Sequence, residues 1–258
     1  MLWQIEGSNT YVLGSVHVTN MARLTLSDIA GRIFEQADRV IFEADQKVAP
    51  DASLFMLPPD TRLDRLMEPP VFRRVHAHWA RLGLPDANLL VLRPVMVAMT
   101  LQISEASRNG YLTQFGVDHL LRERSELARK KIDYLEDLND QLRLLMSTPL
   151  SEQVSLLDHI ATPTDAGFSE IEAMVSAWQN HDLGHFENLL EDRRKLWPQS
   201  VDAVLTRRNE DWAPLIAEMV RAGTHNLIVV GALHLVGPTG LPVLLRQQGL
   251  HLAPRQDV

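Results

Sequence analysis

Cysteine is absent from the 258 residues of this sequence. Its absence excludes a disulfide framework and any chemistry that depends on a thiolate, although it does not fix the cellular compartment. Long apolar runs are absent too, since none approaches the ~20 residues of a membrane-spanning helix. The N-terminus lacks a basic segment followed by an apolar stretch, which is the pattern of a signal peptide. We therefore expect a cytoplasmic protein without a membrane span.

Basic residues are in the minority, because 25 Lys and Arg stand against 33 Asp and Glu and the net charge is −8. Without a basic stripe to neutralise phosphates, nucleic acid is not an expected partner. Repeats of fixed period and low-complexity segments are missing as well. The hydrophobic content of 45% and the charged content of 22% are ordinary for a globular protein. We expect a single domain over residues 1–258.

The sequence does contain a pair of similar units, one near each end. In each unit a short apolar run is followed by glycine and, three residues later, by histidine: Gly14 with His17, and Gly231 with His234. The runs, 11–13 and 227–230, are typical of short buried strands. Glycine at the strand end allows a sharp turn or the close approach of another group. Each unit therefore places an imidazole at the C-terminal edge of a sheet, where open α/β folds keep their sites.

The Gly-x-x-His pattern is weak by itself, because about 0.5 copies are expected by chance from this composition. A third copy, Gly116 to His119, follows polar residues and leads into a helical pattern, so we do not assign it to the site. The plain alternative for the other two is that His17 and His234 are structural histidines that close strand ends. A matched pair favours the functional interpretation over that alternative.

Two carboxylates also follow predicted strands. Residues 39–42 lead to Glu43, and residues 131–135 lead to Glu136. The C-terminal ends of strands that are joined by a right-handed parallel crossover lie at the same edge of a sheet. We therefore expect Glu43 at the same edge as His17. An isolated glutamate after a strand is in most cases an ordinary surface residue, and this alternative stays open.

The hydrophobic pattern predicts an α/β fold with a mixed, mostly parallel sheet flanked by helices and with two large helical insertions. Strands are predicted at residues 2–6, 10–13, 39–43, 131–136, 226–230 and 250–253. Helices are predicted at residues 94–107, 116–129, 137–145, 168–179, 183–197, 210–222 and 238–247. A further helix follows Thr25 or Ser27, either of which can cap its N-terminus.

His181 and His185 resemble the His-Glu-x-x-His zinc signature, with aspartate in place of glutamate. Gly184 weakens a helix there, and aspartate is shorter than the glutamate that must reach a metal-bound water. We interpret this segment as an exposed helix face and not as a metal site. His76 and His78 are two residues apart, a spacing that points them in different directions on a helix.

Five segments, in their order and spacing, resemble the TraB/PrgY/GumN family across nearly the whole chain. They are residues 3–17, 40–45, 135–141, 205–212 and 230–241. The chain departs from the family pattern at Val95, where members often have tryptophan, and at Asp137, where threonine is common. The family is similar to the Tiki metalloproteases, which share the paired Gly-x-x-His motifs and a glutamate. It also looks distantly like the erythromycin-esterase and ChaN folds.

The resemblance implies a metal-dependent hydrolase, acting on peptides, with Mn²⁺ or Co²⁺ as candidate ions. The residue chemistry fits this role, because two imidazoles and a carboxylate form a mixed set that binds Zn²⁺, Mn²⁺, Fe²⁺ or Co²⁺. We predict that His17, Glu43 and His234 are the metal ligands. Such a set leaves positions open for a water whose pKa the ion lowers. Glu136 is predicted as a ligand or, like Glu43, as the general base.

Arg208 and Asn209 stand where a helix is predicted to begin. They could clamp a substrate carboxylate or stabilise an oxyanion. The alternative is that they belong to a helix N-terminus held by a salt bridge. We predict that Arg208 and Asn209 orient the substrate, and the structural alternative stays open.

Two other hypotheses compete with the metal-dependent hydrolase. One is a peptide-binding protein that sequesters its ligand in the same cleft without turnover. The other is a metal-free, esterase-like hydrolase in which His17 or His234 is itself the base. The expected partner in each case is a peptide or small-molecule substrate, and a homodimer stays open.

Overall fold

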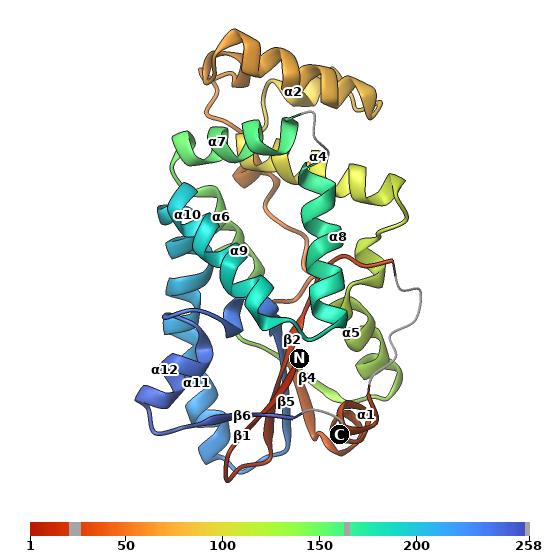
Figure 1. Ribbon diagram of the computed structural model, residues 1–258, viewed down its shortest axis with the longest axis vertical. Helices are drawn as coiled ribbons and strands as arrows, with labels where there is room; N and C mark the ends of the chain where they lie inside the picture. Colours follow the sequence, from red (N-terminus) through yellow and green to blue (C-terminus); the bar gives the residue numbers. More distant parts are fainter. Residues whose placement is uncertain (21–26, 163–165, 256–258) are drawn as a thin grey trace.

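A six-stranded sheet forms one half of the protein, the lower half in Figure 1. The structure is a computed structural model and describes residues 1–20, 27–162 and 166–255. The order of the strands across the sheet is β4-β3-β5-β2-β1-β6. Their bounds in chain order are β1 (Leu2–Ile5), β2 (Thr10–Ser15), β3 (Arg39–Phe42), β4 (Lys131–Tyr134), β5 (Asn226–Gly231) and β6 (Leu252–Pro254).

Four neighbouring strands, β4, β3, β5 and β2, run parallel. β2 pairs with β5 from Thr10 opposite Asn226 to Ser15 opposite Gly231. β1 runs antiparallel to both β2 and β6, so one side of the sheet is a meander of opposite strands. The mixed, mostly parallel sheet confirms the predicted fold class. It also brings segments from the two ends of the sequence together at its centre.

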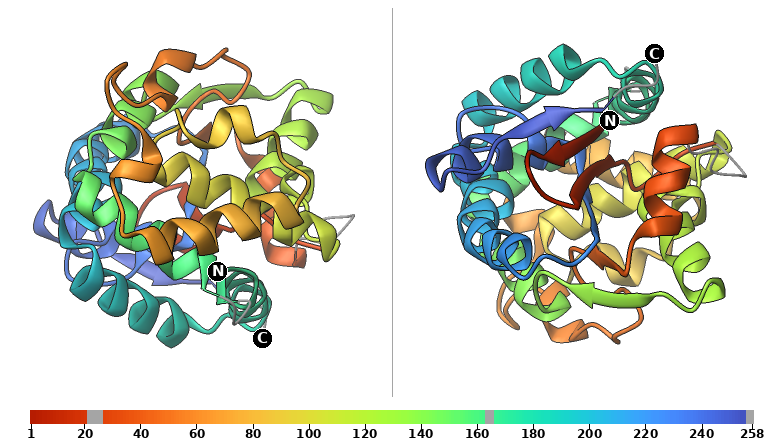
Figure 2. Two further views of the ribbon diagram at one scale, coloured as in Figure 1. Left: turned by 90° about the horizontal axis from the view of Figure 1, so that it is seen from above. Right: turned by 90° about the horizontal axis from the view of Figure 1, so that it is seen from below.

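Helices cover both faces of the sheet, which is why its inner strands are mostly apolar. Figures 1 and 2 show α11 (Arg207–Arg221) and α12 (Leu241–Gln247) on one side, with α1 (Asp28–Gln36) and α5 (Val117–Leu127) on the other. Residues 227–230 of β5 are each at most 1% exposed. Full burial of such a side chain stabilises the fold by roughly 1.5–3 kcal/mol. β5 is therefore firmly packed, and it holds the residues that follow it in the chain at a fixed position.

Two long helical segments interrupt the sheet, as predicted. The segment between β3 and β4 contains α2 (Pro69–Arg81), α3 (Asp86–Leu89), α4 (Pro94–Arg108) and α5, with 3₁₀ turns at Ala52–Phe55, Leu63–Arg65 and Thr113–Phe115. The segment between β4 and β5 contains α6 (Leu138–Met146), α7 (Leu150–Ala161), α8 (Ala166–Gln179), α9 (Leu183–Leu196), α10 (Pro198–Val201), a π-helical turn (Asp202–Thr206) and α11. α2, α4 and α7 share an apolar cluster of their own, and they lie together at one end of the molecule (Figure 1). Within the described part of the chain, no helix is both long and apolar enough to cross a membrane.

One helix start agrees with the prediction and another differs from it. Ser27 caps α1, because its hydroxyl accepts a hydrogen bond from the Ala30 N–H at 3.3 Å, whereas Thr25 lies outside the described residues. The last helix begins at Leu241 and not at residue 238. Gly237 has a φ of +77°, and a Cβ at Gly240 would lie 2.6 Å from the Val236 carbonyl oxygen. Residues 236–240 are therefore a tight turn that delays the helix.

Candidate functional site

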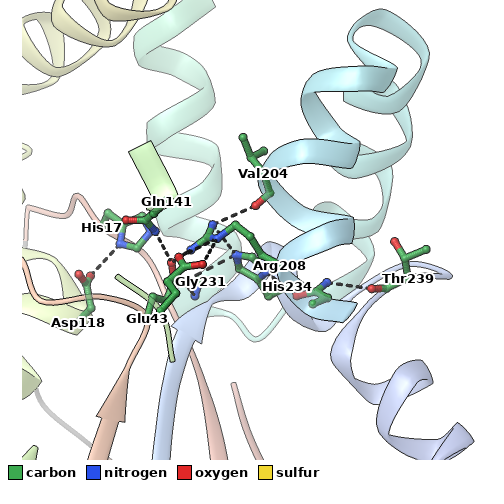
Figure 3. A network of polar contacts seen from close by, with 11 residues as sticks. His17, Glu43, Asp118, Gln141, Val204, Arg208, Gly231, His234 and Thr239 are labelled. Carbon is green, nitrogen blue, oxygen red and sulfur yellow. Dashed lines mark hydrogen bonds and ion pairs between the residues drawn. The ribbon is translucent and has the colours of Figure 1, made fainter. Parts of the chain in front are cut away.

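The predicted histidines and glutamates meet at one edge of the sheet, where the four parallel strands end. His17 follows β2, Glu43 follows β3 and Glu136 follows β4. His234 lies in a 3₁₀ turn (Ala232–Leu235) directly after β5. Figure 3 shows His17, Glu43 and His234 just beyond the strand ends, beside helices of the second insertion. The structure thus brings together residues that are far apart in the sequence.

Glu43 stands at the middle of this group and is 9% exposed. Its Oε1 accepts a hydrogen bond from the Gly231 N–H at 2.7 Å. Its Oε2 accepts from Gln141 Nε2 at 3.2 Å and from Arg208 Nη2 at 2.6 Å. Burial raises the pKa of Glu43, but His234, Arg208 and His17 together with the Gly231 N–H lower it to about 2. Glu43 is therefore a carboxylate at neutral pH.

The Arg208 guanidinium joins the two glutamates, and its side chain is only 8% exposed. Nε donates to Glu136 Oε1 at 2.9 Å, and Nη2 donates to Glu136 Oε1 and Glu43 Oε2, each at 2.6 Å. Nη1 donates to the Val204 carbonyl oxygen at 3.0 Å and faces His234 Nε2 at 3.3 Å. All five N–H groups of an arginine thus have partners. The predicted clamp on a substrate carboxylate has no free donor in this arrangement, because Arg208 already holds two carboxylates of the protein.

Arg208 and Asn209 lie in the first turn of α11, which begins at Arg207, three residues before the predicted start at residue 210. The helical run extends through α10, the π-helical turn and α11, from Pro198 to Arg221. Both residues are buried, and Arg208 pairs with Glu43 and Glu136, so the salt bridge of the alternative interpretation is present although the first turn of α11 continues an earlier helical turn. One turn later, the Trp212 ring lies 4.5 Å from the Arg208 guanidinium carbon and 4.6 Å from the His234 ring, centre to centre. π-Helical turns are frequent at functional sites.

Asn209 fixes the orientation and tautomer of His234. Its Nδ2 donates to the Thr239 carbonyl oxygen at 2.9 Å, which leaves Oδ1 to face His234 Nδ1 at 2.6 Å. Because an amide oxygen only accepts, the proton must lie on Nδ1. Burial lowers the pKa of His234 to about 3, so the ring is neutral. His234 therefore presents an unprotonated Nε2 to the centre of the site.

His17 is the exposed member of the group, with 61% of its side chain open to solvent. The carboxylate of Asp118, in the first turn of α5, lies 3.1 Å from His17 Nδ1 (Figure 3). This carboxylate raises the pKa of His17. Sequence reasoning missed Asp118, and its only signal was its place inside the third Gly-x-x-His copy. With Nδ1 turned to Asp118, Nε2 of His17 faces inward.

The three predicted metal ligands surround the small space beside Gly231. A Cβ on Gly231 would lie 3.4 Å from Glu43 Oε1, 3.6 Å from His17 Nε2 and 3.7 Å from His234 Cδ2. Glycine keeps that space open. Nitrogen and oxygen ligands lie about 2.0–2.2 Å from a bound zinc ion. Within the described residues, no three His, Asp or Glu side chains are placed so that they could all reach one ion at such a distance. The residue types are those that bind transition ions, but among the described residues they are not arranged around a common ion position.

Comparison with known proteins identifies the family of this chain. The model of the family described as "TraB/PrgY/gumN family" matches residues 1–254. The chain belongs to the TraB/PrgY/gumN family. It is similar to "Uncharacterized protein YbaP" of Shigella flexneri, with 25% identity over 240 residues, 92% of this chain and 88% of that protein. The Escherichia coli K12 protein of the same name is also 25% identical, over 92% of this chain and 87% of its own. None of the solved structures matches the chain.

The segments by which this TraB/PrgY/gumN chain resembles its family contain most of the site. His17, Glu43, Glu136 and His234 each lie in a different one of them, and Arg208 with Asn209 lies in the remaining one. Asp118 lies in none of the five. The site is thus assembled from separated family segments, and Asp118 contacts it from outside them.

The histidines that were set aside as a zinc signature stay apart from the site of this family member. His181 has a φ of +56° and precedes α9, so the prediction that it shares a helix face with His185 is wrong. Asp182 caps α9 by accepting a hydrogen bond from the His185 N–H at 3.1 Å. His76 and His78 face different partners, Asp86 and Glu105, as their spacing predicts.

Proposed function

We propose that the protein is a metal-dependent hydrolase that cleaves peptide bonds. One observation carries the proposal: two imidazoles and a carboxylate face the common space beside Gly231 (Figure 3). His234 presents an unprotonated Nε2, and Glu43 is ionised. Mixed nitrogen and oxygen sets of this kind hold Zn²⁺, Mn²⁺ or Co²⁺. A bound ion would supply a water of lowered pKa and polarise the carbonyl group of the substrate.

In this proposal the ligands are His17 Nε2, His234 Nε2 and Glu43, and an ion at His234 Nε2 would displace the hydrogen bond that Arg208 Nη1 donates to this atom. Asn209 fixes the tautomer of His234, as outer partners of metal-binding histidines commonly do. Arg208 holds Glu43 and Glu136 at fixed positions. It therefore acts on the carboxylates of the site and not directly on the substrate.

Glu136 is the proposed general base. Burial raises the pKa of Glu136 in spite of its contact with Arg208. A carboxylate of raised pKa takes up a proton more readily near neutral pH, which is what a general base requires. When Glu136 takes up a proton, the positive charge of Arg208 would still balance the negative charge of Glu43. Glu136 is thus assigned to proton transfer and Glu43 to metal binding.

A metal-free hydrolase is the second candidate, and the contact between His17 and Asp118 favours it. A histidine with a carboxylate at Nδ1 and an exposed ring is the arrangement of a general base. In this mechanism His17 Nε2 would take a proton from water after the ring has lost its own Nε2 proton, and because Asp118 raises the pKa of His17 to about 9, this requires alkaline pH. The two candidates differ in whether removal of metal ions abolishes turnover.

The test is turnover of a peptide library by protein purified without a histidine tag. It is measured after chelation and again after addition of Mn²⁺, Co²⁺ or Zn²⁺. We expect turnover only with an added ion and its loss in Glu43→Gln, which keeps the shape of the side chain. His185→Ala is the control and should behave as the wild type. Turnover that survives chelation supports the metal-free candidate. Peptide binding without turnover supports the sequestering protein and refutes both hydrolases.

A further inference from the structure

The third Gly-x-x-His copy, residues 116–119, packs against the segment that carries His17. A Cβ on Gly116 would overlap the His17 carbonyl oxygen and lie 2.8 Å from the carbonyl carbon. Both obstacles are backbone atoms, so a side chain there could be accommodated only by moving one of the two segments. Only glycine lets these backbones approach so closely.

Hydrogen bonds fix the two segments in this contact. The Val117 N–H, at the start of α5, donates to the Val16 carbonyl oxygen at 2.9 Å. On the other side of His17, the backbones of Thr19 and Leu112 pair as an isolated bridge, in which the Leu112 N–H donates to the Thr19 carbonyl oxygen at 2.7 Å. His17 is therefore held on both sides by bonds to residues 112–117. The conformation of the His17 loop depends on a segment that is about 100 residues away in the chain.

Because of this contact, the Asp118 side chain lies next to the His17 ring. Its Oδ1 lies 3.1 Å from His17 Nδ1, and this buried atom has no other hydrogen-bond partner among the described residues. His119, the histidine of the motif, faces away toward Glu123 at 3.4 Å and Arg122 at 3.3 Å. The glycine and the aspartate of the third motif thus contact His17, and its histidine does not.

We propose that Gly116 and Asp118 are positioning residues for His17. Gly116 allows the N-terminus of α5 to dock on the His17 backbone. Asp118 then engages Nδ1, so that Nε2 faces Glu43. The catalytic consequence rests on the proposed function, but the orientation of the His17 ring does not and can be measured by itself. Outer partners of this kind are typically worth 10–100-fold in metal affinity or activity.

The first test compares Asp118→Leu, which removes the carboxylate at similar volume, with Asp118→Glu, which keeps it, and with His119→Ala as the control from the same motif. Long-range ¹H–¹⁵N spectra of the His17 ring report the position of the proton. We expect the Nδ1 signal to change in Asp118→Leu, because its proton has lost the carboxylate that it faces, and we expect this variant to bind Mn²⁺, Co²⁺ or Zn²⁺ 10–100-fold more weakly. Asp118→Glu should recover part of both properties, and His119→Ala should retain them.

The second test is Gly116→Ala, with Gly31→Ala as its matched control. Gly31 lies in α1, where a Cβ would meet nothing within 4 Å, so alanine should be tolerated or stabilising there. Gly116→Ala should change the His17 ring signals although Asp118 is intact. If Gly116→Ala does not fold, Asp118→Leu decides the matter by itself.

The outcomes separate this proposal from the proposed function. If the wild type shows no turnover, the hydrolase fails, while the His17 spectra still decide the positioning role. If Asp118→Leu leaves the His17 signals and the metal affinity unchanged, the positioning role is overturned, whatever the activity of the wild type. A lower kcat with an unchanged KM in Asp118→Leu, at a melting temperature close to that of the wild type, supports positioning over a general structural role.

Discussion

Replacement of Arg208 by methionine should destabilise the protein more than almost any other change at the site. Methionine keeps much of the side-chain length and its contact with Trp212, but it removes the positive charge and all five N–H donors. Glu43 and Glu136 then lose their shared partner while their side chains remain 11% and 13% exposed. An unpaired buried charge is costly, whereas a buried pair is close to neutral.

The size of the effect follows from the environment of Glu43. A pKa of about 2, against about 4.3 in an unfolded chain, corresponds to about 3 kcal/mol of stability at neutral pH. Arg208 supplies only part of this stabilisation of Glu43, but its removal also leaves Glu136 without its partner. Removal of one partner of a buried pair typically costs 3–5 kcal/mol, and we expect Arg208→Met to fall in that range. For a chain of this size the melting temperature should fall by roughly 6–20 °C.

The effect should also depend on pH in a defined direction. In the wild type the pKa of Glu43 is below its unfolded value, so its contribution is present above about pH 4.3 and is lost as the pH falls toward 2. In Arg208→Met, burial without the cation should raise the pKa of Glu43 above the unfolded value. The carboxylate then destabilises the fold at neutral pH and ceases to do so once it is protonated. The difference in the free energy of unfolding between the wild type and Arg208→Met should therefore become smaller as the pH falls from 7 to 2.

Urea unfolding and thermal melting of chelated protein, at several pH values, measure this difference. Arg207→Met is the matched control, because Arg207 is the preceding residue and its pair with Asp202 is exposed. Its removal should change the free energy of unfolding by less than about 0.5 kcal/mol. A loss below about 1 kcal/mol in Arg208→Met at pH 7 would refute the reasoning, because it would mean that the two carboxylates are not held by this guanidinium.

Two further predictions concern the histidines. His17→Ala and His234→Ala should each abolish most of the metal affinity, and the double variant should lose little more, because ligands of one ion act as a unit. Calorimetric titration with Mn²⁺, Co²⁺ and Zn²⁺ measures this, and additive losses of melting temperature with metal binding unchanged would contradict a shared site. His181→Ala combined with His185→Ala should leave metal content and stability nearly unchanged, since His181 precedes α9 and His185 lies within it. Loss of the metal from that double variant, measured by elemental analysis, would show that the wrong histidines were chosen.

The sequence was sufficient to predict the strands and the edge at which the polar residues gather. Short runs such as 227–230, bounded by glycine, have few alternatives to a buried strand, and parallel strands present their C-terminal ends together. The ends of elements were predicted less well. Residues 238–240 have a helical pattern, but Gly237 and Gly240 hold them in a turn whose geometry depends on contacts with Val236.

The roles of single side chains could not be predicted, because their partners come from distant segments. Arg208 was recognised as a site residue, but nothing local shows that all its donors are used. Its partners lie after β3, β4 and β5 and in the preceding helical turn. Asp118 is an ordinary acidic residue in the first turn of a helix until the packing of Gly116 brings it to His17.

The position of β5 has a consequence for the synthesis of the chain. β5 is the last of the four parallel strands to leave the ribosome, yet it lies between β2 and β3. At 5–20 residues per second, roughly 10 s or more separate the completion of β2 from that of β5. During that interval β2 and β3 each expose a strand edge that another chain could pair with, and His17 has no fixed relation to Glu43. The nascent chain therefore lacks the assembled site and is most prone to aggregate until β5 has been synthesised.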